Sequence, residues 1–171
     1  LADEANAFCE IRPHAIITTN YDQLIENVLK DYQPVLGEGL ISAPFASIGE
    51  IYKIHGSVDK PSSLVLTQED YDRFSQKRKY LTAKLLTFFV EHPIVFVGYS
   101  VEDENIRRIL EDLDEALVLG GGLIPNIFFL TRTGSHDPGF ERVLQVSPSK
   151  GVRVNLIETD DFNWVFGAFA H

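Results

Sequence analysis

Short apolar runs alternate with helical patterns along the chain, and this alternation limits the possible folds more than any other feature. The runs at residues 14–19, 93–97 and 127–130 are rich in β-branched or aromatic residues, and the last two are uninterrupted by charge. Strands that are apolar on both faces are typical of parallel sheets covered by helices on both sides. The pattern therefore predicts an α/β protein with a Rossmann-like three-layer fold and a mostly parallel sheet.

The strands and helices expected from this pattern follow one another without an internal repeat or a convincing linker. Five strands are expected to share one parallel sheet, at residues 14–20, 51–54, 93–97, 126–131 and 152–157. A further short strand is expected at 64–66, and helices at 21–29, 77–90, 100–117, 140–146 and 160–169. We therefore expect residues 1–171 to form a single domain.

Composition excludes several classes of protein. With 25 acidic against 15 basic residues, the net charge of −10 disfavours direct binding of a nucleic-acid backbone by this domain. No apolar run has the roughly 18 residues of a membrane span, and no signal peptide is apparent. The single cysteine, Cys9, excludes an intrachain disulfide and a multi-cysteine zinc site. These features favour a cytoplasmic protein.

Two polar clusters come directly after expected strands, where α/β folds bind their ligands. Thr18, Thr19, Asn20 and Asp22 follow the first apolar run and lead into a helix. The simpler interpretation is that Asn20 or Asp22 only caps that helix. His55 follows the run at 51–54, and a histidine there could act as a general base or merely have a structural role.

A third cluster, Gly98-Tyr99-Ser100, follows the run at 93–97. Glycine permits a ligand to approach the backbone closely, and Ser100 offers a hydroxyl at a helix N-terminus. An ordinary strand-to-helix turn would have the same composition. Each of the three clusters is weak when it is taken alone.

Taken in order, the three clusters resemble the motifs of sirtuins and of sirtuin-like bacterial proteins. The phrases ITTNYDQLIE, YKIHGSVD and IVFVGYSVEDENIRRIL look especially similar to the prokaryotic sirtuin-like domains of antiphage defence systems. The resemblance covers residues 14–131 well and the remainder loosely. It implies an enzyme that uses NAD as its substrate.

The resemblance also implies a role for each matching residue. Asn20 would position the ribose or the attacking water, and His55 would be the catalytic base. Asp22 would recognise the nicotinamide carboxamide. The remaining positions would line the NAD site through strand-end, backbone or hydroxyl contacts: Thr18, Thr19, Gly98 and Ser100.

Two departures from the sirtuin pattern affect these expectations. Sirtuin deacylases carry four zinc-binding cysteines in the segment that matches residues 56–97, which contains none here. No zinc or other metal is therefore expected, and deacylation is in doubt. The N-terminal strand and Gly-Ala-Gly loop of the family are also missing, so the domain is expected to be N-terminally incomplete and to lack its first β-α unit.

The resemblance implies hydrolysis of NAD to nicotinamide and ADP-ribose, in abortive-infection defence against viruses. Such an activity must be controlled, so we expect a homo-oligomer and a sensor domain or partner protein outside this chain. One alternative is a deacylase or ADP-ribosyltransferase that cleaves the same bond. The other is a non-catalytic nucleotide-binding or assembly module.

Overall fold

The computed structural model describes residues 2–36, 39, 48–67, 69, 83, 86–99, 107, 110–111, 114–115, 122–133, 140–147 and 152–170. The chain divides into two compact units. The first consists of Leu1–Leu81 with Phe162–His171, and the second of Thr82–Asp161.

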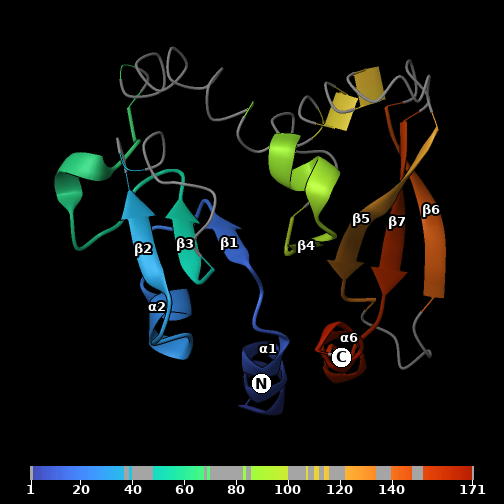
Figure 1. Ribbon diagram of the computed structural model, residues 1–171, viewed down its shortest axis with the longest axis horizontal. Coiled ribbons are helices and arrows are strands. Elements are labelled where there is room, and N and C mark those ends of the chain that lie inside the picture. Colours follow the sequence, from blue (N-terminus) through green and yellow to red (C-terminus); the bar gives the residue numbers. More distant parts are fainter. Residues whose placement is uncertain are drawn as a thin grey trace. The chain divides into compact units, whose positions relative to one another are not determined.

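The first unit contains a three-stranded parallel sheet with the order β1-β3-β2 (Figure 1). Its strands are β1 (Ala15–Thr18), β2 (Gln33–Leu36) and β3 (Glu50–Lys53). The central strand β3 is paired on both sides, and three of its four residues are buried. Pro34 lies in β2 at the edge of the sheet, where a residue without an N–H group is tolerated.

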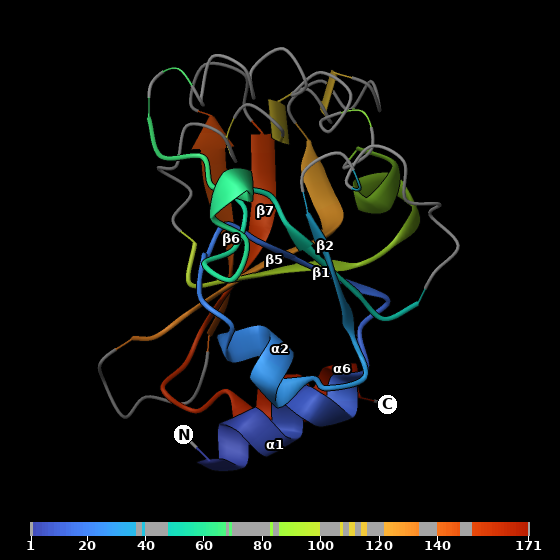
Figure 2. The same cartoon turned by 90° about the vertical axis from the view of Figure 1, so that its left-hand side faces the viewer.

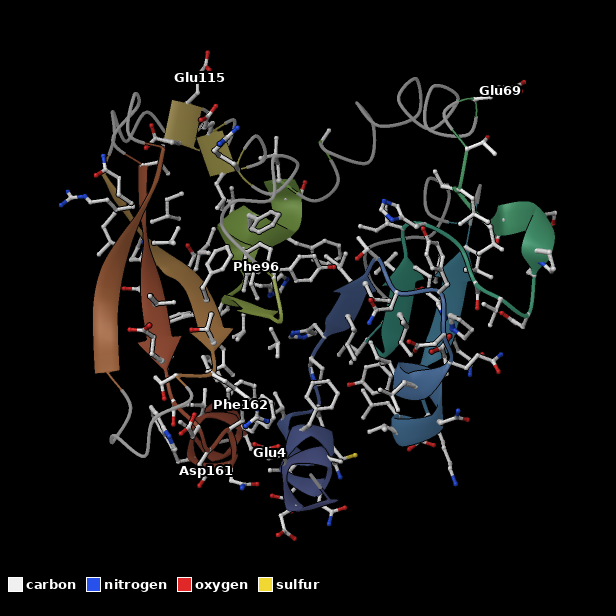
Figure 3. All side chains as sticks on the ribbon, turned by 180° about the vertical axis from the view of Figure 1, so that it is seen from behind. Glu4, Glu69, Phe96, Glu115, Asp161 and Phe162 are labelled. Atoms are coloured by element: carbon white, nitrogen blue, oxygen red, sulfur yellow. The ribbon has the colours of Figure 1, made fainter. Side chains whose placement is uncertain are left out.

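Two helices of the first unit, one near each end of the chain, pack against each other. The helices whose bounds the structure describes in this unit are α1 (Ala2–Ile11), α2 (Leu24–Val28), the 3-10 helix η1 (Pro61–Ser63) and α6 (Asn163–Phe169). Helices α1 and α6 lie side by side in Figures 1 and 2, and the rings of Phe8 and Phe166 meet edge to face with centroids 5.6 Å apart. The carboxylate of Glu4 accepts a hydrogen bond of 3.2 Å from the Phe162 N–H at the start of α6 (Figure 3). These contacts fix the C-terminal helix to the N-terminal one.

The second unit contains a four-stranded sheet with the order β4-β5-β7-β6. Strands β4 (Ile94–Val97), β5 (Leu123–Thr131) and β7 (Val152–Glu158) are parallel, and β6 (Phe140–Ser147) runs antiparallel to β7. Phe96, labelled in Figure 3, stacks between Phe89 and Phe129 with centroid distances of 5.9 and 4.5 Å. All three rings are buried and form the aromatic part of this core.

Two asparagine side chains satisfy backbone carbonyls around β5. The Asn126 amide donates to the carbonyls of Phe89 and His92 at 2.6 and 3.0 Å, at the end of the helical residues 86–91. The Asn155 amide donates to the carbonyls of Pro125 and Ile127, each at 3.0 Å. The β5–β7 register shifts between Leu123 and Phe128, and this irregularity accommodates a proline inside a paired strand.

The structure confirms the α/β class and the positions of five predicted strands, which correspond to β1, β3, β4, β5 and β7. The final helix is confirmed as α6, and the helix expected at 21–29 is present over the shorter range Leu24–Val28. Residues 86–91, at the end of the helix expected at 77–90, are helical. Most of the preceding residues of that helix, and most of those at 100–117, lie outside the described part of the chain.

Three predictions were wrong. Residues 64–66 form no strand, and β6 replaces the helix expected at 140–146. The apolar residues of the latter segment fit either period over so short a length, and pairing with β7 determines the outcome. The described strands form two separate sheets, one of three and one of four strands, instead of the single sheet that was expected.

Candidate active site

The candidate site lies where β1 and β3 end together. The two strands are parallel, and Thr18 is paired with Lys53 at the last position of each. The N–H of Ile54 donates to the carbonyl of Thr18 at 3.0 Å, so the chains remain joined one residue further. Asn20 and His55 each follow this pair by two residues. The fold therefore brings the two expected catalytic residues to the same end of one sheet.

Local hydrogen bonds shape the turn after β1. The buried hydroxyl of Thr18 accepts from the N–H of Asn20 at 3.0 Å. The Asp22 carboxylate accepts from the N–H of Leu24 at 2.9 Å, at the start of α2. The N-cap residue of α2 is Gln23, whose side chain makes no capping hydrogen bond, so Asp22 satisfies the N–H of Leu24 from the position before the cap and Asn20 is exposed. An exposed amide at a strand end is available to a bound molecule.

The loop that carries His55 is held by both backbone and ring contacts. The carbonyl of His55 accepts from the N–H of Val65 at 3.1 Å, and the Tyr21 hydroxyl donates to the carbonyl of Val65 at 3.3 Å. The rings of Tyr21 and His55 lie 6.3 Å apart, with an angle of 31° between their planes. The half-buried imidazole therefore has an aromatic neighbour from the turn that also bears Asn20.

Gly56 is required by the shape of this loop. Its φ angle is +89°, a conformation that side chains disfavour, and a Cβ atom there would lie 2.2 Å from the carbonyl oxygen of Ser63. Only glycine allows the chain after His55 to pass so close to residues 63 and 64. The His-Gly pair in the sequence is therefore a structural requirement at residue 56, whatever the role of the imidazole.

A fully buried lysine lies beneath the site and was missed in the sequence analysis. The Lys53 side chain has 0% exposure, and its ammonium lies 2.6 Å from a carboxylate oxygen of Glu26 in α2. It also donates to the carbonyl oxygens of Tyr21 and Asp22. A lysine at the end of an expected buried strand, next to a candidate catalytic histidine, was the signal that could have identified it.

Ser57 completes the junction between the two segments. This buried side chain donates to the carbonyl of Tyr21 at 3.5 Å. The neighbouring N–H of Val58 donates to the same carbonyl at 3.0 Å. A hydrogen bond with the Ser57 side chain also holds the pKa of the exposed Asp59 below its ordinary value. The carbonyl of Tyr21 therefore accepts hydrogen bonds from several groups of the 53–58 segment, which connect that segment to the turn after β1.

The remaining predicted site residues are placed as follows. Thr19 is half-buried and lies between Thr18 and Asn20 in the first unit. Gly98 follows β4 in the second unit with a φ angle of +74°, and an added Cβ would meet no atom within 4 Å. Ser100 lies outside the described residues. The roles of all of these residues in binding or catalysis stay predictions.

Neither a metal-binding cluster nor a membrane-spanning helix is found among the residues that the structure describes. Within those ranges, no group of three or more His, Cys, Asp or Glu side chains is arranged to hold a metal ion. Of the helices in the described part of the chain, none has both the length and the apolar character needed to cross a membrane.

Comparison with known proteins gives consistent matches. The family model described as "SIR2-like domain" matches residues 14–143. The chain is 32% identical over 108 residues to "NAD(+) hydrolase ThsA" of Bacillus cereus (strain MSX-D12), covering 60% of this chain and 23% of that protein. An Enterococcus faecium protein of the same name is 27% identical over 169 residues, covering 85% of this chain and 34% of its own length.

A third relative bears a different name. "Defense-associated sirtuin 2" of Bacillus subtilis is 31% identical over 106 residues, covering 58% of this chain and 10% of that protein. The chain thus spans about a third or less of the length of these curated relatives.

Proposed function

The chain belongs to the SIR2-like domain family, and we propose that it is the catalytic part of an NAD hydrolase that cleaves the nicotinamide–ribose bond. The observation that carries the proposal is the placement of Asn20 and His55, each two residues beyond the Thr18–Lys53 pair at one sheet end. The names of the relatives, which describe NAD hydrolases and a defence-associated sirtuin, support it.

In the proposed reaction, water replaces nicotinamide at the anomeric carbon of the ribose. The carbon–nitrogen bond breaks with its electron pair passing to the cationic nicotinamide ring, which leaves as a neutral molecule. Asn20 holds the attacking water or a ribose hydroxyl through its exposed amide. His55 removes a proton as the water attacks, leaving a hydroxyl on ADP-ribose. Because the cationic nicotinamide is already a good leaving group, the chain needs to stabilise chiefly an oxocarbenium-like transition state.

The other predicted residues would bind NAD. Asp22 would accept a hydrogen bond from the nicotinamide carboxamide, while the hydrogen bond from the N–H of Leu24 to Oδ1 orients its carboxylate. Thr18 and Thr19 would line the strand end, and Gly98 and Ser100 would contact the ribose and phosphates. No zinc takes part in this scheme.

The proposed setting is defence against viruses in the bacterial cytoplasm. Depletion of NAD would stop the infected cell, and an activity of this kind must be controlled. We expect control by homo-oligomer formation and by a sensor domain or partner protein outside this chain. Direct binding of nucleic acid by this acidic domain is not expected, since its net charge is −10.

Single substitutions in the full-length parent protein test the proposal. His55→Ala and Asn20→Ala should each lower the rate of nicotinamide release about 10²–10⁴-fold, with the melting temperature nearly unchanged. The double variant should lose much less than the product of the two losses, because groups acting as a unit fail together. His14→Ala is the matched control, since this exposed histidine precedes β1 at the opposite end of the strand. A folded His55→Ala protein that keeps its turnover would refute the assignment of the base.

A further inference from the structure

The buried ammonium of Lys53 pairs with the Glu26 carboxylate, but it also donates hydrogen bonds to two backbone carbonyls that carry no charge. An ammonium group has three donor hydrogens. Here Nζ has three acceptors: one carboxylate oxygen of Glu26 at 2.6 Å, the carbonyl of Tyr21 at 3.5 Å and the carbonyl of Asp22. Two of the three belong to the backbone of the turn that carries the proposed NAD-binding and catalytic residues. Most of this lysine's hydrogen-bonding capacity is therefore directed at that turn.

Lys53 joins the end of β3 to the turn after β1 through hydrogen bonds to two backbone carbonyls of that turn. Lys53 is the last residue of β3, and the carbonyls that it binds lie 31 and 32 positions earlier in the chain. Ser57 and Val58, further along the same segment, donate to the Tyr21 carbonyl as well. Because His55 lies between these donors, the position of the turn is fixed relative to the imidazole.

From these contacts we propose that Lys53 is a positioning residue: it holds the 20–22 backbone at the distance from His55 that hydrolysis requires. This proposal rests on the proposed function, since it assigns Asn20 and His55 to one reaction. Lys53 has 0% exposure, so in this proposal it acts on the reaction through the turn that it holds. A displacement of about 1 Å in a catalytic group can reduce the rate about 10²-fold, and this sets the expected effect of losing the lysine.

A pair of variants that differ only at residue 53 separates positioning from simple stabilisation. Glu26→Leu keeps the lysine and its carbonyl contacts, but leaves a buried ammonium without its counterion. Lys53→Met/Glu26→Leu replaces the whole ion pair by apolar side chains of similar length, a change that is often neutral or stabilising. The double variant should therefore have the higher melting temperature of the two.

Activity should follow the opposite order. In the full-length parent protein, Glu26→Leu should retain most of its kcat for nicotinamide release, whereas Lys53→Met/Glu26→Leu should lose about 10²-fold in kcat. Hydrogen exchange of the amides at residues 20–24 should be faster in the double variant than in Glu26→Leu. If kcat instead follows melting temperature, Lys53 has only a structural role.

The exchange measurement keeps the two proposals distinguishable. A parent protein that releases no nicotinamide would refute the proposed function, while faster exchange in the double variant would still show that Lys53 holds the turn. Unchanged exchange at residues 20–24 would overturn the positioning role, whatever the wild-type activity.

Discussion

The glycine after His55 offers a quantitative test of the loop that carries the candidate base. In Gly56→Ala, the new Cβ would lie 2.2 Å from the Ser63 oxygen, 2.5 Å from its carbonyl carbon and 2.8 Å from the nitrogen of Leu64. All three are backbone atoms, so no side-chain rotation relieves the overlap. The closest contact must open to about 3.4 Å, the start of ordinary van der Waals contact.

The expected loss of stability has two parts. A non-glycine residue at a φ of +89° costs about 1–2 kcal/mol. Moving the 63–64 backbone also breaks the hydrogen bonds from Val65 to His55 (3.1 Å) and from Leu64 to Pro61 (3.2 Å), at about 1 kcal/mol each. The free energy of unfolding should therefore fall by about 3–4 kcal/mol in total.

Gly98→Ala is the matched control for this substitution. Gly98 has a similar φ of +74°, but an added Cβ there meets no atom within 4 Å. Only the backbone term applies, so its loss should be about 1–2 kcal/mol. Denaturant titration of each variant measures the two values. Equal losses at positions 56 and 98 would show that the close passage of the chain beside His55 is not present in solution.

Three further predictions concern separate features. Ser57→Ala should raise the pKa of Asp59 toward its ordinary value, as measured by NMR titration of the carboxyl carbon. Because the pKa is depressed in the folded state, the interaction stabilises the fold at pH values above the unfolded-state pKa, and this stabilisation is lost as the pH falls through the folded-state pKa. An Asp59 pKa that is the same in Ser57→Ala as in the wild type would exclude this hydrogen bond as the cause. Asn126→Leu should lower the free energy of unfolding by about 1–3 kcal/mol, because two carbonyls lose their donor; a neutral result in denaturant titration would contradict the contacts described. Nicotinamide release by the full-length parent should persist in the presence of a metal chelator, and loss of activity that zinc restores would show a metal requirement.

The strands were predictable where sequence and topology agree. The apolar runs that became β1, β4 and β5 are short and bounded by turn residues, and a parallel sheet is the usual environment for such runs. The segment of β6 was mistaken for a helix because its apolar spacing fits both periods, and only its partner β7 distinguishes them. Strand β2 was missed because Gln33 and Pro34 are poor strand formers that an edge position tolerates.

The site was predictable to a different extent. The placement of Asn20 and His55 at one sheet end follows from the rule that polar residues after parallel strands share an edge. The role of Lys53 could not be predicted in the same way, because it depends on which groups the buried ammonium contacts. Those partners, in α2 and in the turn after β1, are distant in sequence and meet only in the folded chain.

Isotope tracing during the reaction of the full-length parent protein with NAD tests the central claim most directly. In water enriched in oxygen-18, hydrolysis should release equal amounts of nicotinamide and ADP-ribose, with one labelled oxygen on the anomeric carbon of the ADP-ribose. Mass spectrometry of the products should show this label in the wild type and almost no product in His55→Ala. A deacylase would instead transfer the acyl group of an added acylated peptide to ADP-ribose, leaving the deacylated peptide. An ADP-ribosyltransferase would attach the ADP-ribosyl group to a protein acceptor, and either enzyme would form only small amounts of labelled free ADP-ribose. Absence of nicotinamide release under all of these conditions would contradict the proposed function.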